Sequence, residues 1–139
     1  MMRKFIILVL LITISYSKSF ADINLKKDFG IVTLMYHRFN EQKYPSTNIK
    51  LDVFKKQIEE IQNSDARLIS FDEFKKTIDD KSFKERLILL TVDDGFLSFY
   101  ENAWPIFREK KIPFIFFINT ENIGSTGYMN WKQIKEVSK

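Results

Sequence analysis

The sequence contains no cysteine and a single histidine, His37, among its 139 residues. Without cysteine the chain forms no disulfide, offers no thiolate nucleophile and has no thiolate ligands for zinc. A single histidine also restricts the imidazole groups available for binding a metal or carrying a proton. Any catalytic site formed by these residues therefore depends mainly on other side chains.

A basic stripe of the kind that binds nucleic acid is also missing. The formal charge is +4 and the pI is about 9.2, but Arg3, Lys4 and Lys18 fall in the first 21 residues, which contain no acid. Without that segment, 19 of the 22 basic residues face 18 acidic ones and the charge falls to +1. The lysines between residues 50 and 84 alternate with acids, as on solvated helix faces. We therefore expect no nucleic-acid partner.

Residues 1–21 have the three-part pattern of a secretory signal peptide. Arg3 and Lys4 form a basic start, and residues 5–14 are apolar except for one threonine. Ser19 and Ala21 place small side chains at the two positions that a signal peptidase reads. The alternative is an uncleaved N-terminal anchor, although the apolar run is shorter than the roughly 20 residues of a membrane span. Either segment exports the remainder to the periplasm, the cell envelope or the medium, with membrane contact only if the signal stays uncleaved.

The rest of the chain alternates segments of strand and helix pattern, after a short N-terminal segment at residues 22–30. The predicted strands are 31–36, 67–69, 87–92 and 114–118, and the predicted helices are 52–62, 70–78, 97–110 and 131–137. The strands are apolar runs, which suits a parallel sheet covered on both faces. Loops are predicted at 37–50, 79–86 and 124–127, and Pro105 is expected to kink or restart its helix.

Three polar residues are expected to cap helices: Asp52, Ser70 and Asn130. Ser70 and Glu73 have the spacing of a capping box. Strands that alternate with helices predict βα units and an α/β fold. An eight-unit barrel typically needs about 250 residues, so we interpret residues 31–139 as the N-terminal part of an incomplete (β/α) barrel with parallel strands.

Two adjacent carboxylates, Asp93 and Asp94, directly follow the most apolar internal strand, and Gly95 follows them. Ligands of α/β folds bind at the carboxyl ends of parallel strands. Neighbouring like charges disfavour each other's ionisation, so such a pair usually has a counterion such as a metal. Consecutive strand residues point in opposite directions, so one acid can bind a metal while the other acts as a base. The alternative is a simple turn or helix cap, since Asp-Gly is a common turn pair. His37 also follows an apolar strand, and we expect it at the same edge.

Three segments together resemble the polysaccharide deacetylases, the family with chitooligosaccharide-deacetylase (NodB) homology. They are LMYHRF (34–39), LTVDDGF (90–96) and IPFIFFINTENIGSTGYMNWKQI (112–134). The resemblance covers residues 31–139 and is greatest to exported poly-N-acetylglucosamine deacetylases. The family motif Thr-Phe-Asp-Asp-Gly appears here with Val92 in place of phenylalanine.

The resemblance implies a metal-dependent hydrolase that removes N-acetyl groups from a polysaccharide. It assigns the general base to Asp93 and one ligand of a divalent metal, with zinc expected, to Asp94. The family's two metal-binding histidines belong to a His-x-x-x-His motif that this sequence does not contain, and its arginine and general-acid histidine motifs are also absent. His37 matches neither metal histidine and stays without an assigned role near the site. We therefore expect these 139 residues alone to bind metal poorly and to lack activity.

Two other functions stay open at this point. A glycoside hydrolase uses two carboxylates about 5 to 9.5 Å apart, which adjacent strand residues rarely provide, and loss of bound metal in Asp94→Ala would argue against it. A non-catalytic, exported carbohydrate-binding remnant is the other alternative. The DNA beyond the codon for Lys139 distinguishes it from an enzyme fragment.

Overall fold

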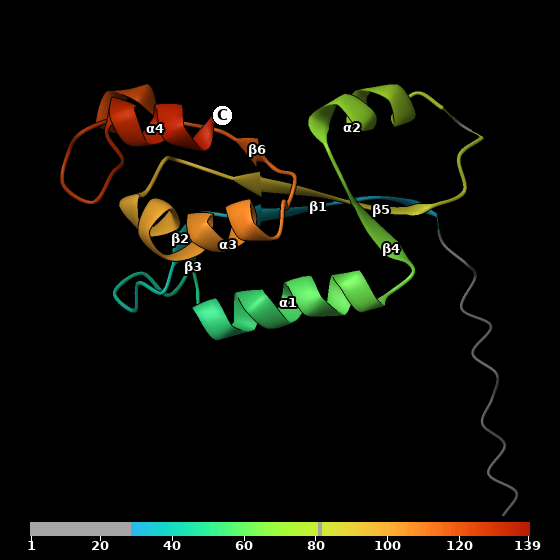
Figure 1. Cartoon of the computed structure of the whole chain (residues 1–139), viewed down its shortest axis with the longest axis horizontal. Coiled ribbons are helices and arrows are strands. Elements are labelled where there is room, and N and C mark those ends of the chain that lie inside the picture. The colour runs from blue at the N-terminus through green and yellow to red at the C-terminus, as the bar shows by residue number, and fades with distance from the viewer. Residues whose placement is uncertain (1–28, 81) are drawn as a thin grey trace, which may run out of the picture.

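The computed structural model describes residues 29–80 and 82–139 (Figure 1). The predicted signal peptide, residues 1–21, and most of the segment 22–30 lie outside the described residues. Within residues 29–80 and 82–139, no helix has the length and apolar character needed to cross a membrane.

Four parallel strands form the main sheet, with β5 (Arg86–Val92) at its centre. Strand β1 (Gly30–Tyr36) pairs with β5 along its whole length on one edge. On the other edge, β4 (Ala66–Ile69) pairs with residues 86–89 of β5 and β6 (Ile115–Phe116) pairs with residues 91 and 92. The predicted parallel α/β fold is confirmed, and the sheet of the described residues is open rather than closed into a barrel.

The remaining elements connect and cover these strands (Figure 1). They are β2 (Arg38–Phe39), β3 (Asn48–Ile49), α1 (Leu51–Asn63), α2 (Phe71–Thr77), a π-helix (Phe99–Ala103), α3 (Trp104–Glu109), a 3-10 turn (Thr120–Asn122) and α4 (Trp131–Val137). The segment 37–50, predicted as a loop, contains β2 and β3, which pair in parallel. Strand β6 is shorter than the predicted 114–118 because its partner strand β5 ends at Val92.

Two of the three predicted helix caps are confirmed. Asn130 caps α4 through a complete capping box with Gln133, and Ser70 caps α2. The prediction for Asp52 is wrong, because α1 begins one residue earlier and its N-cap is Lys50, which makes no side-chain cap bond. Asp52 instead lies in the first helical turn, where a carboxylate interacts favourably with the helix dipole.

Pro105 restarts a helix, as predicted, and the preceding turn widens. The N–H of Trp104 donates to the carbonyl of Phe99, which closes a π-helical turn over Phe99–Ala103. Proline has no N–H to continue this ladder and suits the first positions of a new helix, and Pro105 occupies them in α3.

The two faces of β5 pack in separate clusters. Leu90 and Val92 are fully buried in the larger one, with apolar residues of α1, α3 and α4. Leu87 and Leu89 are buried in the smaller one, which includes Phe74 of α2. Successive strand residues point to opposite faces, so burial on both faces explains why this strand is a continuous apolar run.

Aromatic rings fill the larger cluster. Its fully buried rings are Phe39, Phe54, Phe99 and Phe107, and their centroids lie 5.2–6.4 Å apart wherever two of them are in contact. Two phenylalanines of the predicted helices and strands lie outside both clusters. Phe71 and Phe117 are 48% and 54% exposed.

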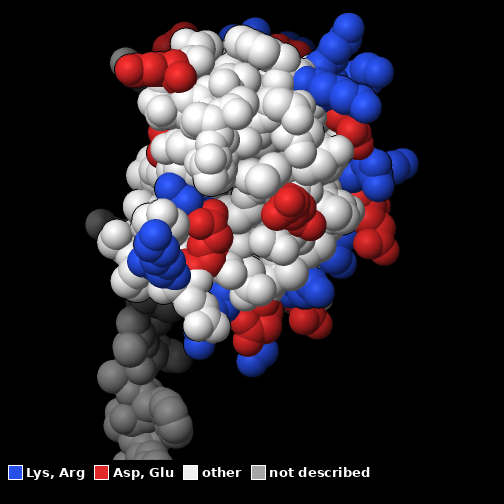
Figure 2. Space-filling model, turned by 90° about the vertical axis from the view of Figure 1, so that its left-hand side faces the viewer, with Lys and Arg blue, Asp and Glu red and all other residues white. Residues whose placement is uncertain are grey.

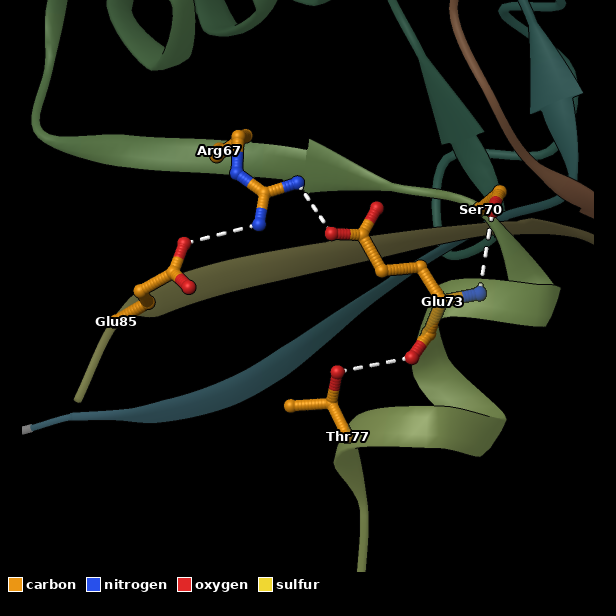
Figure 3. A network of polar contacts seen from close by, with 5 residues as sticks. All are labelled: Arg67, Ser70, Glu73, Thr77 and Glu85. Atoms are coloured by element: carbon orange, nitrogen blue, oxygen red, sulfur yellow. Dashed lines mark hydrogen bonds and ion pairs between the residues drawn. The ribbon is translucent and has the colours of Figure 1, made fainter. Parts of the chain in front are cut away.

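An ionic network joins β4, α2 and the start of β5 (Figure 3). Arg67 donates to the carboxylates of Glu73 and Glu85, and these bonds raise the pKa of the guanidinium. Ser70 accepts from the N–H of Glu73, and Thr77 donates to the Glu73 carbonyl. The Glu73 side chain therefore pairs with Arg67 instead of completing the predicted capping box.

We expect Arg67→Ala to lower the free energy of unfolding by less than about 1 kcal/mol, because exposed ion pairs contribute little. The effect should shrink further at about 1 M salt, where the screening length is near 3 Å. Urea unfolding of Arg67→Ala, Glu85→Ala and the double variant measures the coupling. A loss above about 2 kcal/mol would contradict the assignment of this network as a surface feature.

The buried phenol of Tyr36 is expected to make the stability of the fold depend on pH in the alkaline range. Burial raises the pKa of its phenol, and its hydroxyl donates to Gln57 at 3.0 Å. The unfolded chain loses this proton near pH 10, whereas the folded chain keeps it to higher pH. The folded state then binds more protons, so the free energy of unfolding falls as pH rises from about 10 through the folded pKa.

Urea unfolding at about pH 9 and about pH 11 tests this expectation. Tyr36→Phe should lose less stability between the two pH values than the unchanged chain, and Tyr44→Phe, at a more exposed position, is the matched control. Equal losses in the unchanged chain and in Tyr36→Phe would show that the phenol of Tyr36 does not contribute.

Candidate active site

The carboxyl ends of β1, β5 and β6 meet on the left of Figure 1. Figure 2 looks onto this side and shows a broad area of uncharged residues with a few acidic groups within it. The segment 117–130, which follows β6, contains a single charged residue, Glu121. A surface of this kind suits a neutral ligand better than a highly charged one.

Asp93 and Asp94 occupy a tight turn at the end of β5. Asp94 has φ +72° and Gly95 has φ +74°, so both lie in the left-handed region. Glycine adopts this conformation readily because it has no Cβ. Asp94 is the less expected case, because left-handed residues with a side chain are uncommon and often mark functional sites.

Hydrogen bonds from a distant segment hold this turn in place. The N–H of Met129 donates to the Gly95 carbonyl at 2.9 Å, and the N–H of Leu97 donates to the Gly127 carbonyl at 2.9 Å. Phe96 forms an antiparallel bridge with Tyr128, and their rings lie 4.8 Å apart. The segment before α4 therefore braces the acidic turn from one side.

The strand register places His37 next to the acidic turn. Tyr36 pairs with Val92, and the N–H of Asp93 donates to the Tyr36 carbonyl at 2.8 Å. His37 and Asp93 are thus the next residues of two adjacent strands, which are spaced about 4.8 Å apart. Both side chains are partly buried.

Arg38 contacts the turn from the other side, and its role is not predicted from the sequence. Its guanidinium carbon lies 3.5 Å from the ring centroid of Phe96 and 3.9 Å from that of Tyr44. It also pairs with Glu41 at 2.9 Å, with only 12% of its side chain exposed. A cation between two rings forms favourable cation–π contacts, so Arg38 joins the segment after β1 to the residue after Gly95.

The helix that follows the turn holds Phe39. Ser98 accepts from the N–H of Phe39 at 3.2 Å, and Asn102 donates to the Phe39 carbonyl at 2.9 Å. Ser98 is buried although it is polar. A polar residue at an otherwise apolar helix position is the one sequence signal for such a contact, and it does not reveal the partner.

One oxygen of the acidic pair is available to a further group. Asp93 Oδ1 is buried and has no hydrogen-bond partner among the described residues, and an unpaired buried acceptor is costly unless a cation, water or ligand contacts it. The described residues contain no group of three or more His, Cys, Asp or Glu side chains placed to hold a metal ion. The acids therefore fit a metal as part of a ligand set rather than as a complete one.

Comparisons with known proteins agree with this geometry. Residues 80–139 match the family model described as polysaccharide deacetylase. The chain is 28% identical over 169 aligned positions to a poly-beta-1,6-N-acetyl-D-glucosamine N-deacetylase of Staphylococcus aureus, covering 99% of this chain and 58% of that protein. It is 34% identical over 77 residues to the protein of the same name from Staphylococcus epidermidis, covering 55% of this chain and 27% of that protein.

Solved structures give the same result for the fold. IcaB from Ammonifex degensii superposes with a TM-score of 0.72 at 30% identity, over 80% of this chain and 49% of that one. The Streptococcus pyogenes deacetylase PplD superposes with a TM-score of 0.66 at 22% identity, over 78% of this chain and 51% of that one. The chain thus spans about half the length of these two structures.

Proposed function

The described residues form part of a polysaccharide deacetylase domain, and from this premise we propose that the chain contributes to hydrolysis of N-acetyl groups on an N-acetylglucosamine polysaccharide. One observation carries the proposal: Asp93 and Asp94 lie at the carboxyl end of the central strand, where Asp94 has a left-handed backbone and Asp93 has a buried oxygen without a hydrogen-bond partner among the described residues. The names of the staphylococcal relatives favour poly-β-1,6-N-acetylglucosamine as the substrate. The predicted signal makes export part of the proposal.

Asp93 acts as the general base in this proposal. It removes a proton from the water that attacks the acetyl carbonyl carbon. The nitrogen takes up a proton as the C–N bond breaks, which gives acetate and a free amine. General-base catalysis contributes roughly 10²- to 10⁴-fold. The N–H of Asp93 is fixed to Tyr36 on the adjacent strand, which positions the carboxylate relative to His37.

Asp94 supplies one metal ligand in the proposal, and zinc is the expected ion. Such a metal polarises the carbonyl and acidifies water. The left-handed backbone of Asp94 turns its side chain away from the direction that an extended residue would give it. The remaining ligands, by resemblance two histidines, come from outside the described residues.

The test compares the 139-residue chain with the same chain extended after Lys139 by the C-terminal remainder of the Staphylococcus aureus relative. We expect the extended protein to release acetate from a β-1,6-linked N-acetylglucosamine oligomer with zinc present, and the chain alone to release none. The complete staphylococcal relative is the positive control.

Two results would contradict the proposal. A folded, zinc-loaded extended protein without acetate release would overturn the deacetylase function. If the 139-residue chain alone bound zinc stoichiometrically and turned over the substrate, the remaining metal ligands would not come from outside the described residues.

A further inference from the structure

We propose that a pocket beside His37 binds an uncharged sugar residue next to the one whose acetyl group is removed. The inference rests on the proposed function. The pocket has a volume of about 410 Å³ and lies between the carboxyl end of β1, the segment that leads into β3, and helix α1.

The lining of this pocket is composed of apolar side chains, hydroxyl groups, carboxamides and His37. No Asp, Glu, Lys or Arg side chain of the described residues lines it, although 29% of the chain is charged. The larger pocket between α1 and α3, about 630 Å³, is different, because Lys55, Glu59, Glu109 and Lys110 line it. A charged ligand in the pocket beside His37 would lack a fixed counter-charge, so its chemistry favours a neutral one.

Two carboxamides line the pocket, and protein donors already occupy their oxygens. Asn48 Oδ1 accepts from the N–H of Glu41 at 2.7 Å, and Gln57 Oε1 accepts from the hydroxyl of Tyr36 at 3.0 Å. Each amide keeps an NH₂ group that can donate. Two oriented donors suit the hydroxyl and acetamido oxygens of a sugar.

Apolar side chains complete the lining. Met35 and Val53 are 62% and 43% exposed, and both border the pocket. Sugar rings carry C–H groups on their faces as well as hydroxyls at their edges, so they need apolar contacts and hydrogen-bond donors together. Pockets that combine apolar walls with a few placed polar groups are typical of small-molecule sites.

The position of the pocket indicates that it holds a neighbouring sugar of the polymer rather than the sugar that reacts. His37 lines it, and the preceding residue, Tyr36, accepts from the N–H of Asp93 at 2.8 Å. Adjacent strands are about 4.8 Å apart, so the pocket begins one strand from the catalytic turn. A polymer with one residue over Asp93 can extend along the strand ends into it.

The test titrates the full 139-residue chain with β-1,6-linked and β-1,4-linked N-acetylglucosamine tetramers, followed by NMR of the backbone amides and by calorimetry. We expect shifts at Met35, Thr47, Asn48 and Gln57. Asn48→Asp keeps the acceptor for Glu41 but removes the NH₂ donor, and we expect binding to weaken about 10-fold, which is 1.4 kcal/mol. Asn63→Asp, the same change in the pocket between α1 and α3, is the matched control and should bind as the unchanged chain does.

Gln57→Met removes the second NH₂ donor and keeps a side chain of similar length. Because it adds no charge, it shows whether the new charge in Asn48→Asp is what weakens binding. Weakening in both pocket variants, with Asn63→Asp unaffected, supports the site, and the tighter tetramer identifies the linkage. No binding by the unchanged chain, or equal binding by all variants, overturns it. Neither result concerns acetate release by the extended protein, so the proposed function is judged separately.

Discussion

Replacing Asp93 with asparagine in the extended protein is expected to lower acetate release by about 10²- to 10⁴-fold, with the zinc content unchanged. Asparagine keeps the size of the side chain and the N–H that bonds to Tyr36, but it cannot accept the proton of the attacking water. The measurement combines kcat for acetate release with metal analysis of the purified protein. If the variant lost both its zinc and its turnover, Asp93 would be a metal ligand instead of the base.

Asp94→Asn is the companion variant that separates the two acids. Asparagine tolerates the left-handed backbone better than other residues with a side chain, so the φ of +72° at this position should be retained. We expect this variant to lose zinc as well as turnover. A glycoside hydrolase needs no metal at this pair, so cleavage of the oligomer into shorter sugars by a metal-free Asp94→Asn variant would favour that alternative.

Phe99→Ala is expected to lower the free energy of unfolding by about 3–5 kcal/mol, the range for large-to-small changes in a core. Phe99 is fully buried. Its ring lies within 5.8 Å, centroid to centroid, of Phe39, Phe107, Phe114 and Phe116. Alanine removes the ring from the point where β2, α3 and β6 meet, and urea unfolding followed by far-UV circular dichroism measures the loss.

Phe71→Ala is the matched control, because it makes the same change at a residue that is 48% exposed. Phe71 contacts one other ring, that of Phe74, at 6.2 Å. We expect it to lose less than half as much stability as Phe99→Ala. Equal losses in the two variants would contradict the central role of Phe99 in the aromatic cluster.

The strands and most helices could be predicted because their signals are local. The run from Leu87 to Val92 is apolar throughout, and burial on both faces of a central parallel strand requires such a run. Asn130 and Ser70 mark helix starts by a bond to an N–H three residues away. The position of Asp93 at the end of a strand follows from the same local pattern.

Other features depend on contacts between distant residues and could not be predicted. Arg38 stacks on Phe96, 58 positions later in the chain, and nothing in the sequence near Arg38 identifies that ring. Gly95 and Leu97, which follow Asp94 in the chain, bond to Met129 and Gly127, and the sequence near Asp94 does not identify these partners. Phe71 and Phe117 lie in a predicted helix and a predicted strand, yet about half of each side chain is exposed, because burial depends on residues that are distant in the sequence.

The bonds that Gly95 and Leu97 make with Met129 and Gly127 also determine when the acidic turn can form during synthesis of the chain. A ribosome releases the two adjacent acids more than 30 residues before their bracing segment, because Met129 lies 34 positions after Gly95. Contacts between separated parts of a chain form late, after the cost of closing the intervening loop has been met. The nascent polypeptide therefore carries its paired negative charges in an unfinished turn until β6 and the segment behind it have emerged and docked.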